Sequence, residues 1–149
     1  MQVKVSRIDP VEYQRAAEIW ESSVRATHHF VAEDDIVSFR PLVRGAFKEL
    51  PQLAGLRSDS DELVGFVGVA DGKVEMPFLD PAFRGRGGGR TLLKHARTVF
   101  GAIAVDVNEQ NEQAVGFYLH EGCEVVGRSE LDSSGKPYPI LHLSMSNDS

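Results

Sequence analysis

The sequence predicts a single mixed α/β domain, and three observations support this. The chain has 149 residues, enough for one domain that buries roughly two-thirds of its unfolded surface. Segments with apolar residues at every second position, typical of strands, are interspersed with segments whose apolar residues recur at helical spacing. A glycine-rich stretch separates one apolar run from the next helical pattern. Because no repeat, linker or low-complexity tract divides the chain, we expect one domain over residues 1–149.

Composition and charge exclude several classes of protein. The 42% hydrophobic and 26% charged residues are ordinary for a globular protein. A net charge of −6 argues against nucleic acid as the main partner, which usually needs a basic face. The single cysteine excludes a disulfide framework and favours a reducing compartment. We see no signal peptide and no apolar run near the ~20 residues of a membrane helix, so a cytoplasmic protein without a membrane partner is expected.

The first third of the chain predicts a strand and two helices. Alternating apolar residues over 3–8 predict the strand. Asp9-Pro10 looks like an N-cap followed by a proline in the first turn, and the helical spacing after it continues to about residue 25. A second helical pattern covers residues 36–50 and contains Pro41, which predicts a kink or two shorter helices.

The middle of the chain predicts three strands. Residues 53–57 form a short candidate strand, and the valine-rich residues 63–70 form a longer one. Asp71-Gly72 predicts a hairpin turn into a third strand over 74–79. Pro77 cannot donate a ladder hydrogen bond, so this strand is either peripheral or bulged near Pro77.

The last third predicts two helices and three strands. Apolar spacing over residues 92–100 indicates a helix, and residues 103–107 indicate a buried strand parallel to its predecessor. Asn111 is expected to cap a short second helix. Two closing strands are expected over 123–127 and 138–143.

The glycine-rich stretch between the strand at 74–79 and the helix at 92 predicts an anion site. Glycines let the backbone approach a phosphate, and the first N–H groups of a helix point at it. The arginines add fixed positive charge. We therefore hypothesise a pyrophosphate site made by Arg84, Gly85, Arg86, Gly87, Gly88, Gly89 and Arg90. The alternatives are a plain glycine-rich turn with solvated arginines, another nucleotide site and an RNA-binding segment, although the Walker and dinucleotide fingerprints do not fit the spacing.

Two motifs resemble a known family. Arg84-x-x-Gly87-x-Gly89 resembles the first signature of the GNAT superfamily of acyl-CoA N-acyltransferases, and Asn111-x-x-Ala114-x-x-x-Tyr118 resembles its second motif. Residues 27–30 and 107–118 further resemble a group of small bacterial acetyltransferases. The resemblance implies a central, mostly antiparallel twisted sheet of about six to seven strands, with a parallel splayed pair in the middle and about four flanking helices.

The resemblance also implies a cofactor and its site. Acetyl-CoA would be the co-substrate, with its pyrophosphate on the amides of residues 86–90. The backbone of Phe78 and Leu79 would bind the pantetheine arm. Asn111 would bond to the coenzyme, or only cap its helix. Gly88 replaces an aliphatic residue that is usual in the family, and we expect a more mobile loop with weaker binding.

The implied reaction is direct attack of a primary amine on the thioester. Tyr118 would act as general acid toward the leaving thiolate; otherwise it is a core aromatic. Glu75 shares a strand face with Leu79 and is a candidate base, or an exposed glutamate. His28 and His29 precede the second helix, where the family's acceptor site forms, and either takes a proton or lies on a surface loop. Cys123 is expected to be a small buried residue.

The acceptor and assembly are less specified by the sequence. We expect a small-molecule or peptide amine, and a monomer or homodimer. Residues 33–35 are acidic and either attract a cation or only begin a helix. A non-catalytic acyl-CoA-binding module is the main alternative function, and it would not need Tyr118.

Overall fold

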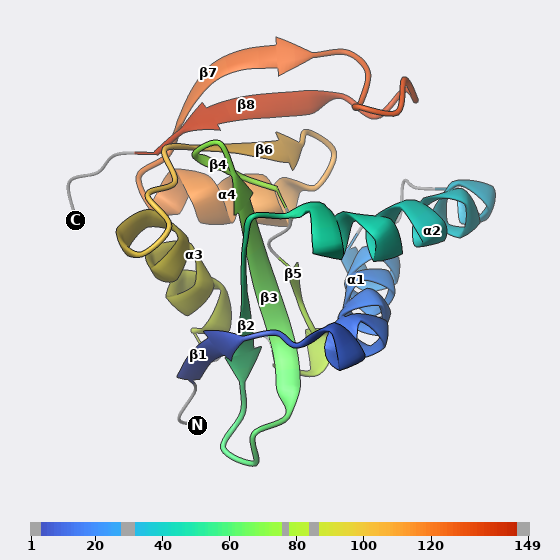
Figure 1. Ribbon diagram of the computed structural model, residues 1–149. Coiled ribbons are helices and arrows are strands. Elements are labelled where there is room, and N and C mark those ends of the chain that lie inside the picture. Colours follow the sequence, from blue (N-terminus) through green and yellow to red (C-terminus); the bar gives the residue numbers. More distant parts are fainter. Residues whose placement is uncertain (1–3, 28–31, 76–77, 84–86, 146–149) are drawn as a thin grey trace.

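The alternating segments of the sequence assemble into one eight-stranded sheet with helices on both faces in the computed structural model (Figure 1). The structure describes residues 4–27, 32–75, 78–83 and 87–145. The strands are β1 Lys4–Arg7, β2 Gln52–Arg57, β3 Leu63–Ala70, β4 Lys73–Val74, β5 Phe78–Leu79, β6 Ala104–Asn108, β7 Glu124–Ser129 and β8 Ile140–Ser144. The helices are α1 Tyr13–Thr27, α2 Glu33–Glu49, α3 Gly88–Thr98 and α4 Glu112–His120, with short 3-10 turns at Pro10–Glu12 and Pro81–Phe83.

The sheet is mostly antiparallel, with one parallel pair in its middle. The strand order is β1-β2-β3-β4-β6-β8-β7, and β5 pairs with β3 beyond β4. The parallel pair joins β4 to β6, with Lys73 opposite Ala104 and Val74 opposite Val105. This confirms the expected fold. There are eight strands instead of six or seven because the strand expected over 74–79 is divided into β4 and β5.

The division between β4 and β5 opens the sheet. Val69 lies opposite Val74, whereas Phe66 lies opposite Phe78, so a step of three residues along β3 corresponds to a step of four along the chain from β4 to β5. The register therefore shifts by one residue between β4 and β5, as in a β-bulge. The expectation that Glu75 and Leu79 share a strand face is wrong, because Leu79 packs against the same core as Val74 and Glu75 alternates with Val74. In the described part of the chain β4 pairs with β6, but β5 pairs only with β3. Pro77 lies outside the described residues, so its own place in the bulge stays a prediction.

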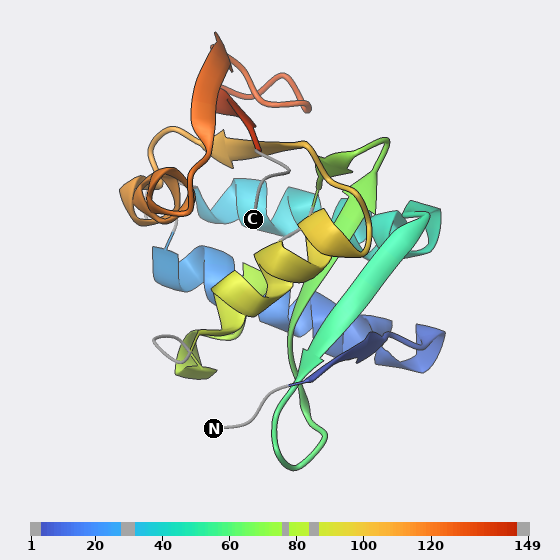
Figure 2. The ribbon, with the colours of Figure 1, turned by 90° about the vertical axis from the view of Figure 1, so that its left-hand side faces the viewer.

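The two faces of the sheet have separate cores. α1 and α2 cover one face, and α3 and α4 cover the other, as the two perpendicular views show (Figures 1 and 2). On the first face Ile19, Trp20 and Phe47 pack with Phe66 of β3. On the second face Leu92, Leu93 and Tyr118 belong to a cluster of buried residues from β2, β3, β6 and β8. The sheet is thus a layer between two pairs of helices. At the opening between β5 and β6 the facing edges of these two strands are not paired with each other.

Helix α2 decides between the two alternatives expected at Pro41. The alternative of two shorter helices is wrong, because a single helix continues from Glu33 to Glu49 with Pro41 inside it, whereas the alternative of a kink stays a prediction. The carbonyl of Val37 loses its usual N–H donor there. Val37 is 47% exposed, so water can replace the missing donor.

The helix after the glycines also differs from its expected bounds. It begins at Gly88 and ends at Thr98, so Val99 is exposed instead of contributing to an apolar face. Gly101 follows with a φ of 69°, a left-handed conformation that separates the helix from β6. Among the described residues, the structure contains no helix that is long and apolar enough to cross a membrane.

Candidate active site

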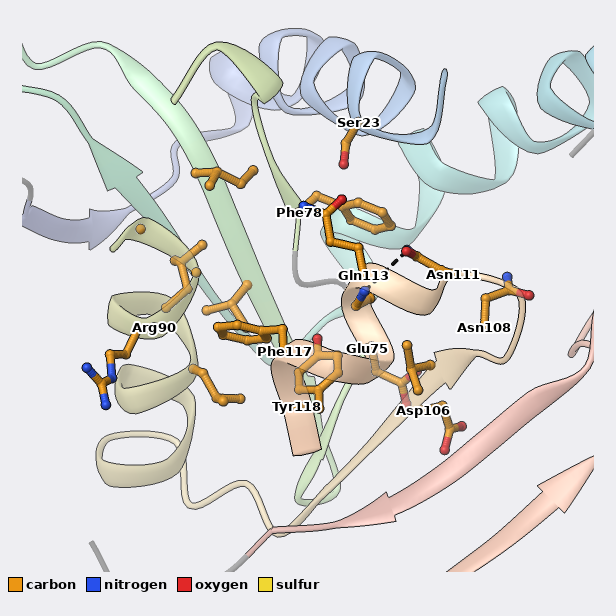
Figure 3. Close-up of a pocket in the computed structure, with 18 of the residues that line it drawn as sticks. Ser23, Glu75, Phe78, Arg90, Asp106, Asn108, Asn111, Gln113, Phe117 and Tyr118 are labelled. Carbon is orange, nitrogen blue, oxygen red and sulfur yellow. Dashed lines mark hydrogen bonds between the residues drawn. The ribbon is translucent and has the colours of Figure 1, made fainter. Parts of the chain in front are cut away.

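The opening between β5 and β6 is part of a cleft of about 630 Å³ (Figure 3). Helices α3 and α4, strands β3 to β6, one residue of α1 and the β7–β8 loop line it. Nine residues that the sequence predicted for the site lie in this lining: Glu75, Phe78, Leu79, Gly87, Gly88, Gly89, Arg90, Asn111 and Tyr118. The fold therefore gathers them on one surface.

Other predicted residues lie outside the described part of the chain. These are His28, His29, Arg84, Gly85 and Arg86. Their expected roles at the acceptor site and around the pyrophosphate stay predictions.

The start of α3, from Gly87 to Arg90, is the candidate cradle for an anion. Gly87 is the N-cap with a φ of 79°, which favours glycine. The N–H of Thr91 donates to the Gly87 carbonyl over 3.0 Å and begins the intrahelical ladder. The amides of Gly88, Gly89 and Arg90 precede this bond, so they are the donors that a helix leaves for a ligand.

Gly88 has a packing reason that the sequence did not reveal. It is buried, and a Cβ added there would lie 2.8 Å from Leu56 Cδ2 and 3.1 Å from Leu79 Cδ1. Leu56 and Leu79 fill the volume that an aliphatic side chain would take at this position. Glycine therefore allows α3 to begin directly against β2 and β5.

The guanidinium of Arg90 lies away from the cradle. Its Nε is 3.1 Å from Glu121 Oε1, and the side chain is 74% exposed. Figure 3 shows it pointing away from the cleft. In this arrangement the backbone amide of Arg90, more than its charge, is available to the candidate cradle.

Of the two residues of β5, Leu79 offers its backbone to the opening. The N–H of Asp80 donates to the Val64 carbonyl over 2.8 Å. Antiparallel neighbours alternate, so the backbone of Phe78 also faces β3, whereas the N–H and carbonyl of Leu79 face the other way. The sequence analysis assigned both residues this role, and the register supports it for Leu79. Phe78 instead packs its ring 5.8 Å from that of Phe66.

Tyr118 brings a buried phenol into the cleft. Its side chain is only 5% exposed, and its ring centroid lies 5.3 Å from that of Phe117. The hydroxyl points into the cleft in Figure 3. Burial raises the pKa of Tyr118 well above its ordinary value, so the phenol stays neutral and keeps its O–H as a donor. Cys123 is buried beside it, and burial raises the pKa of its thiol, which fits the expected core role.

Asn111 serves its helix as expected. Its Oδ1 accepts a hydrogen bond of 3.2 Å from the Ala114 N–H at the start of α4. The residue is buried at the cleft, so this cap fixes the position of the helix that carries Tyr118.

A chain of polar contacts on the sheet was missed by the sequence analysis. Lys73 Nζ donates to Asp106 Oδ2 over 3.0 Å and lies 3.7 Å from Glu75 Oε1. Asp106 Oδ1 lies 2.7 Å from His142 Nδ1, and His142 Nε2 lies 2.7 Å from Ser129 Oγ. The alternation of Val105, Asp106, Val107 and Asn108 was the available signal, because it places the two polar residues on one face.

Hydrogen bonds set the charge state of this chain. Burial raises the pKa of Asp106, but the hydrogen bonds from His142 and Lys73 outweigh it and lower the pKa overall. The hydrogen bond to Asp106 raises the pKa of Lys73 against the opposing effect of burial. Asp106 is therefore a carboxylate and Lys73 an ammonium near neutral pH.

The β7–β8 loop is tied to the start of α2. Lys136 Nζ lies 2.9 Å from Asp35 Oδ1, and the hydroxyl of Tyr138 donates to the same carboxylate. The Tyr138 hydroxyl, followed by Lys136, lowers the pKa of Asp35. Glu33 is paired with Arg25. Two of the three acidic residues at 33–35 are thus engaged in ion pairs that join elements of the fold.

Comparisons with known proteins find a matching family model, a sequence relative and similar solved structures. The family model described as "Acetyltransferase (GNAT) domain" matches residues 43–138. The peptidyl-lysine N-acetyltransferase YjaB of Salmonella typhimurium is 40% identical over 96% of this chain and 98% of its own length. The solution structure of the apo form of YjaB from Escherichia coli superposes with a TM-score of 0.89 at 40% identity, over 97% of each chain.

A more distant structure shares the fold. The PaiA N-acetyltransferase of Thermoplasma acidophilum, in complex with coenzyme A, gives a TM-score of 0.74 at 20% identity. The alignment covers 97% of this chain and all of that protein (100%).

Proposed function

The chain belongs to the family of GNAT acetyltransferases, and from this premise we propose that it transfers the acetyl group of acetyl-CoA to a primary amine by direct attack. One observation supports this more than any other. The free amides at the start of α3, the outward N–H of Leu79 and the buried phenol of Tyr118 all line one cleft. A phosphate site, an oxyanion donor and a proton donor are the groups that the transfer requires.

The coenzyme would lie along the part of the cleft between the start of α3 and Tyr118. Its pyrophosphate would bind the amides of Gly88, Gly89 and Arg90, with Arg84, Gly85 and Arg86 adjoining them in the chain. The pantetheine arm would follow β5, where the Leu79 carbonyl and N–H lack a strand partner in the described part of the sheet. The Leu79 N–H would then donate to the thioester oxygen as negative charge develops on it.

The proton transfers follow from the bonds that change. A neutral amine forms the new C–N bond, the C–S bond breaks, and the nitrogen loses the proton that balances protonation of the thiolate. Tyr118 donates toward the thiolate as it leaves, because its phenol is neutral and lies in the cleft. Glu75 is the candidate base that accepts the amine proton, directly or through water, and His28 is the second candidate.

The acceptor that we propose is the side-chain amine of a peptidyl lysine. The YjaB relative, identical at 40% of aligned positions, is named for this acceptor. The cleft is also open beyond Tyr118, where Glu75 and Asp106 provide carboxylates for an ammonium group. A small-molecule amine is the alternative, and it would use the same donors and acceptors.

Calorimetric titration with acetyl-CoA tests the cofactor first. We expect saturable binding of acetyl-CoA and no comparable binding of a nicotinamide dinucleotide. Release of thiol in the presence of a peptide with one lysine, blocked at both termini, then tests the transfer. Binding without thiol release across a panel of peptides and small amines would favour the non-catalytic acyl-CoA-binding module. Absence of binding by folded protein would reject the proposal.

A further inference from the structure

One face of the opened sheet carries polar groups that the donor half of the reaction does not use. Val74, Val105 and Val107 point to the core shared with α3 and α4. The residues that alternate with them point to the opposite face. These are Lys73, Glu75, Asp106 and Asn108, and all four line the cleft. The cleft therefore passes from the face covered by α3 and α4, where Tyr118 lies, to the opposite face, which carries these polar residues.

Asp106 is held in place on the polar face by two basic partners. Its Oδ2 accepts from Lys73 on β4 over 3.0 Å, and its Oδ1 lies 2.7 Å from His142 on β8. Ser129 on β7 in turn contacts the far nitrogen of His142 at 2.7 Å. This ladder across β6, β8 and β7 fixes the carboxylate on the side away from the cleft, while Lys73 contacts it from β4.

Lys73 has two carboxylates within reach. It bonds to Asp106 and lies 3.7 Å from Glu75, and its side chain is 39% exposed. Lys73 thus offers one ammonium to two carboxylates, those of Asp106 and Glu75. The Lys73 ammonium is also the same chemical group as the ammonium of a lysine acceptor. An incoming ammonium can take its place at Asp106 while Lys73 keeps Glu75.

Asn108 adds an acceptor without a donor. Its Oδ1 is buried and has no hydrogen-bond partner among the described residues. Asn108 follows Asp106 by two residues on the same face, and Figure 3 shows both side chains extending from β6. An ammonium group carries three donors, so one group can satisfy an amide oxygen and a carboxylate together.

We propose that Asp106 and Asn108 bind the ammonium of the acceptor. In the absence of the acceptor, Lys73 pairs with Asp106, and the incoming ammonium displaces the Lys73 side chain toward Glu75. This rests on the proposed function and identifies the acceptor half of that site. Asp106 and Asn108 are binding residues, whereas Lys73 and His142 are positioning residues.

Direct binding of a lysine analogue tests the proposal without any need for turnover. The probe is Nα-acetyl-lysine N-methylamide, and the control ligand is the norleucine analogue, which lacks the amine. The ring resonances of His142 report binding by NMR, because its imidazole contacts Asp106. We expect a saturable shift with the lysine probe and none with the norleucine probe. Equal shifts with the two ligands, or no shift with either, would overturn the proposal.

Two substitutions with opposite expected signs make the test specific. Asp106→Asn removes the charge and should weaken binding of the lysine probe about tenfold or more. Lys73→Met removes the resident ammonium that competes for Asp106, and it should tighten binding of the lysine probe several-fold. Lys73→Arg keeps a positive charge there and should leave the affinity for the probe near that of the wild-type protein. Lys48→Met, at an exposed position on α2, is the control for loss of a lysine. If Asp106→Asn does not fold, the tightening by Lys73→Met still decides.

Steady-state kinetics separate this proposal from the proposed function. Lys73→Met should lower the KM of a single-lysine peptide while leaving the affinity for acetyl-CoA within twofold. Unchanged or raised acceptor KM together with intact acetyl-CoA binding would reject the acceptor site and keep the acetyltransferase. Loss of acetyl-CoA binding in the wild-type protein would reject the proposed function, and the NMR titration would still decide the lysine site.

Discussion

At the scale of single residues, the hydroxyl of Tyr118 can be removed without disturbing the packing around it. The ring belongs to the core cluster of α3, α4 and the sheet, and the Phe117 ring lies beside it. Tyr118→Phe keeps this ring and deletes the proton donor. We expect turnover to fall by roughly 10²–10⁴, the usual contribution of a general acid, with acetyl-CoA affinity changed only a few-fold. Stopped-flow or steady-state thiol release measures the first quantity, and calorimetry measures the second. Unchanged turnover would remove Tyr118 from the mechanism.

Gly88 permits a second experiment at this scale. A Cβ at Gly88 would collide with Leu56 and Leu79, so Gly88→Ala should cost about 1–3 kcal/mol of stability. It should also weaken acetyl-CoA binding, because Leu79 must shift. Gly116 on α4 has no atom within 4 Å of an added Cβ, and Gly116→Ala should stabilise by up to ~1 kcal/mol. Urea unfolding of both variants checks this contrast, and equal effects at the two glycines would contradict it.

At the scale of elements, α2 remains helical at Pro41, although proline disfavours the interior of a helix. Pro41 is exposed, so its ring fills no core space. Pro41→Ala would restore a donor for the Val37 carbonyl. It would also increase the conformational entropy of the unfolded chain, which partly offsets this gain in stability. We expect the free energy of unfolding to increase by about 1–2 kcal/mol. For a chain of this size, each kcal/mol raises the Tm by about 2–4 °C. Pro51→Ala, beyond the end of α2, should bring no such gain. A Tm that falls or stays constant in Pro41→Ala would show that the helix has adapted fully to the proline.

Local patterns predicted the elements whose signals are themselves local. Asp71-Gly72 predicted the β3–β4 hairpin, and both residues adopt the positive φ that such a turn requires (52° and 77°). Asn111 predicted the cap of α4. At Pro41 the local signal left two alternatives, a kinked helix or two shorter helices. The chain forms one helix there because packing of Ile36, Val43 and Phe47 against the sheet and α1 outweighs local propensity.

The sequence predicted the parts of the candidate site whose residues are close together in the chain, but not the contacts between residues of different strands. The motifs at 84–90 and 111–118 predicted several residues that line the cleft, namely Gly87, Gly88, Gly89, Arg90, Asn111 and Tyr118, because the residues of each motif are close in sequence. Lys73, Asp106 and His142 come from three different strands, and only the assembled sheet brings them within hydrogen-bond distance. Likewise, the collision that excludes a side chain at Gly88 depends on Leu56, which is distant in sequence.

At the scale of the whole molecule, the cleft joins two parts of the sheet that share a short ladder. The parallel β4–β6 pairing spans two residues of each strand, and the core cluster on the α3–α4 face crosses the same boundary. A ligand that contacts α3, β5 and α4 together adds a further connection. Ligand present at a hundredfold excess over its Kd stabilises the native state by about 2.7 kcal/mol.

We therefore expect such an excess of acetyl-CoA to raise the Tm by about 5–10 °C, whereas a nicotinamide dinucleotide should not. Hydrogen exchange identifies which connection causes the increase. Acetyl-CoA seated along the whole cleft should slow exchange at the Leu79 amide and in α4 as well as at the start of α3. Protection confined to the first turn of α3 would mean that the protein holds only the phosphates. The thioester would then lie away from Tyr118, and the ligand would not connect the two parts of the sheet.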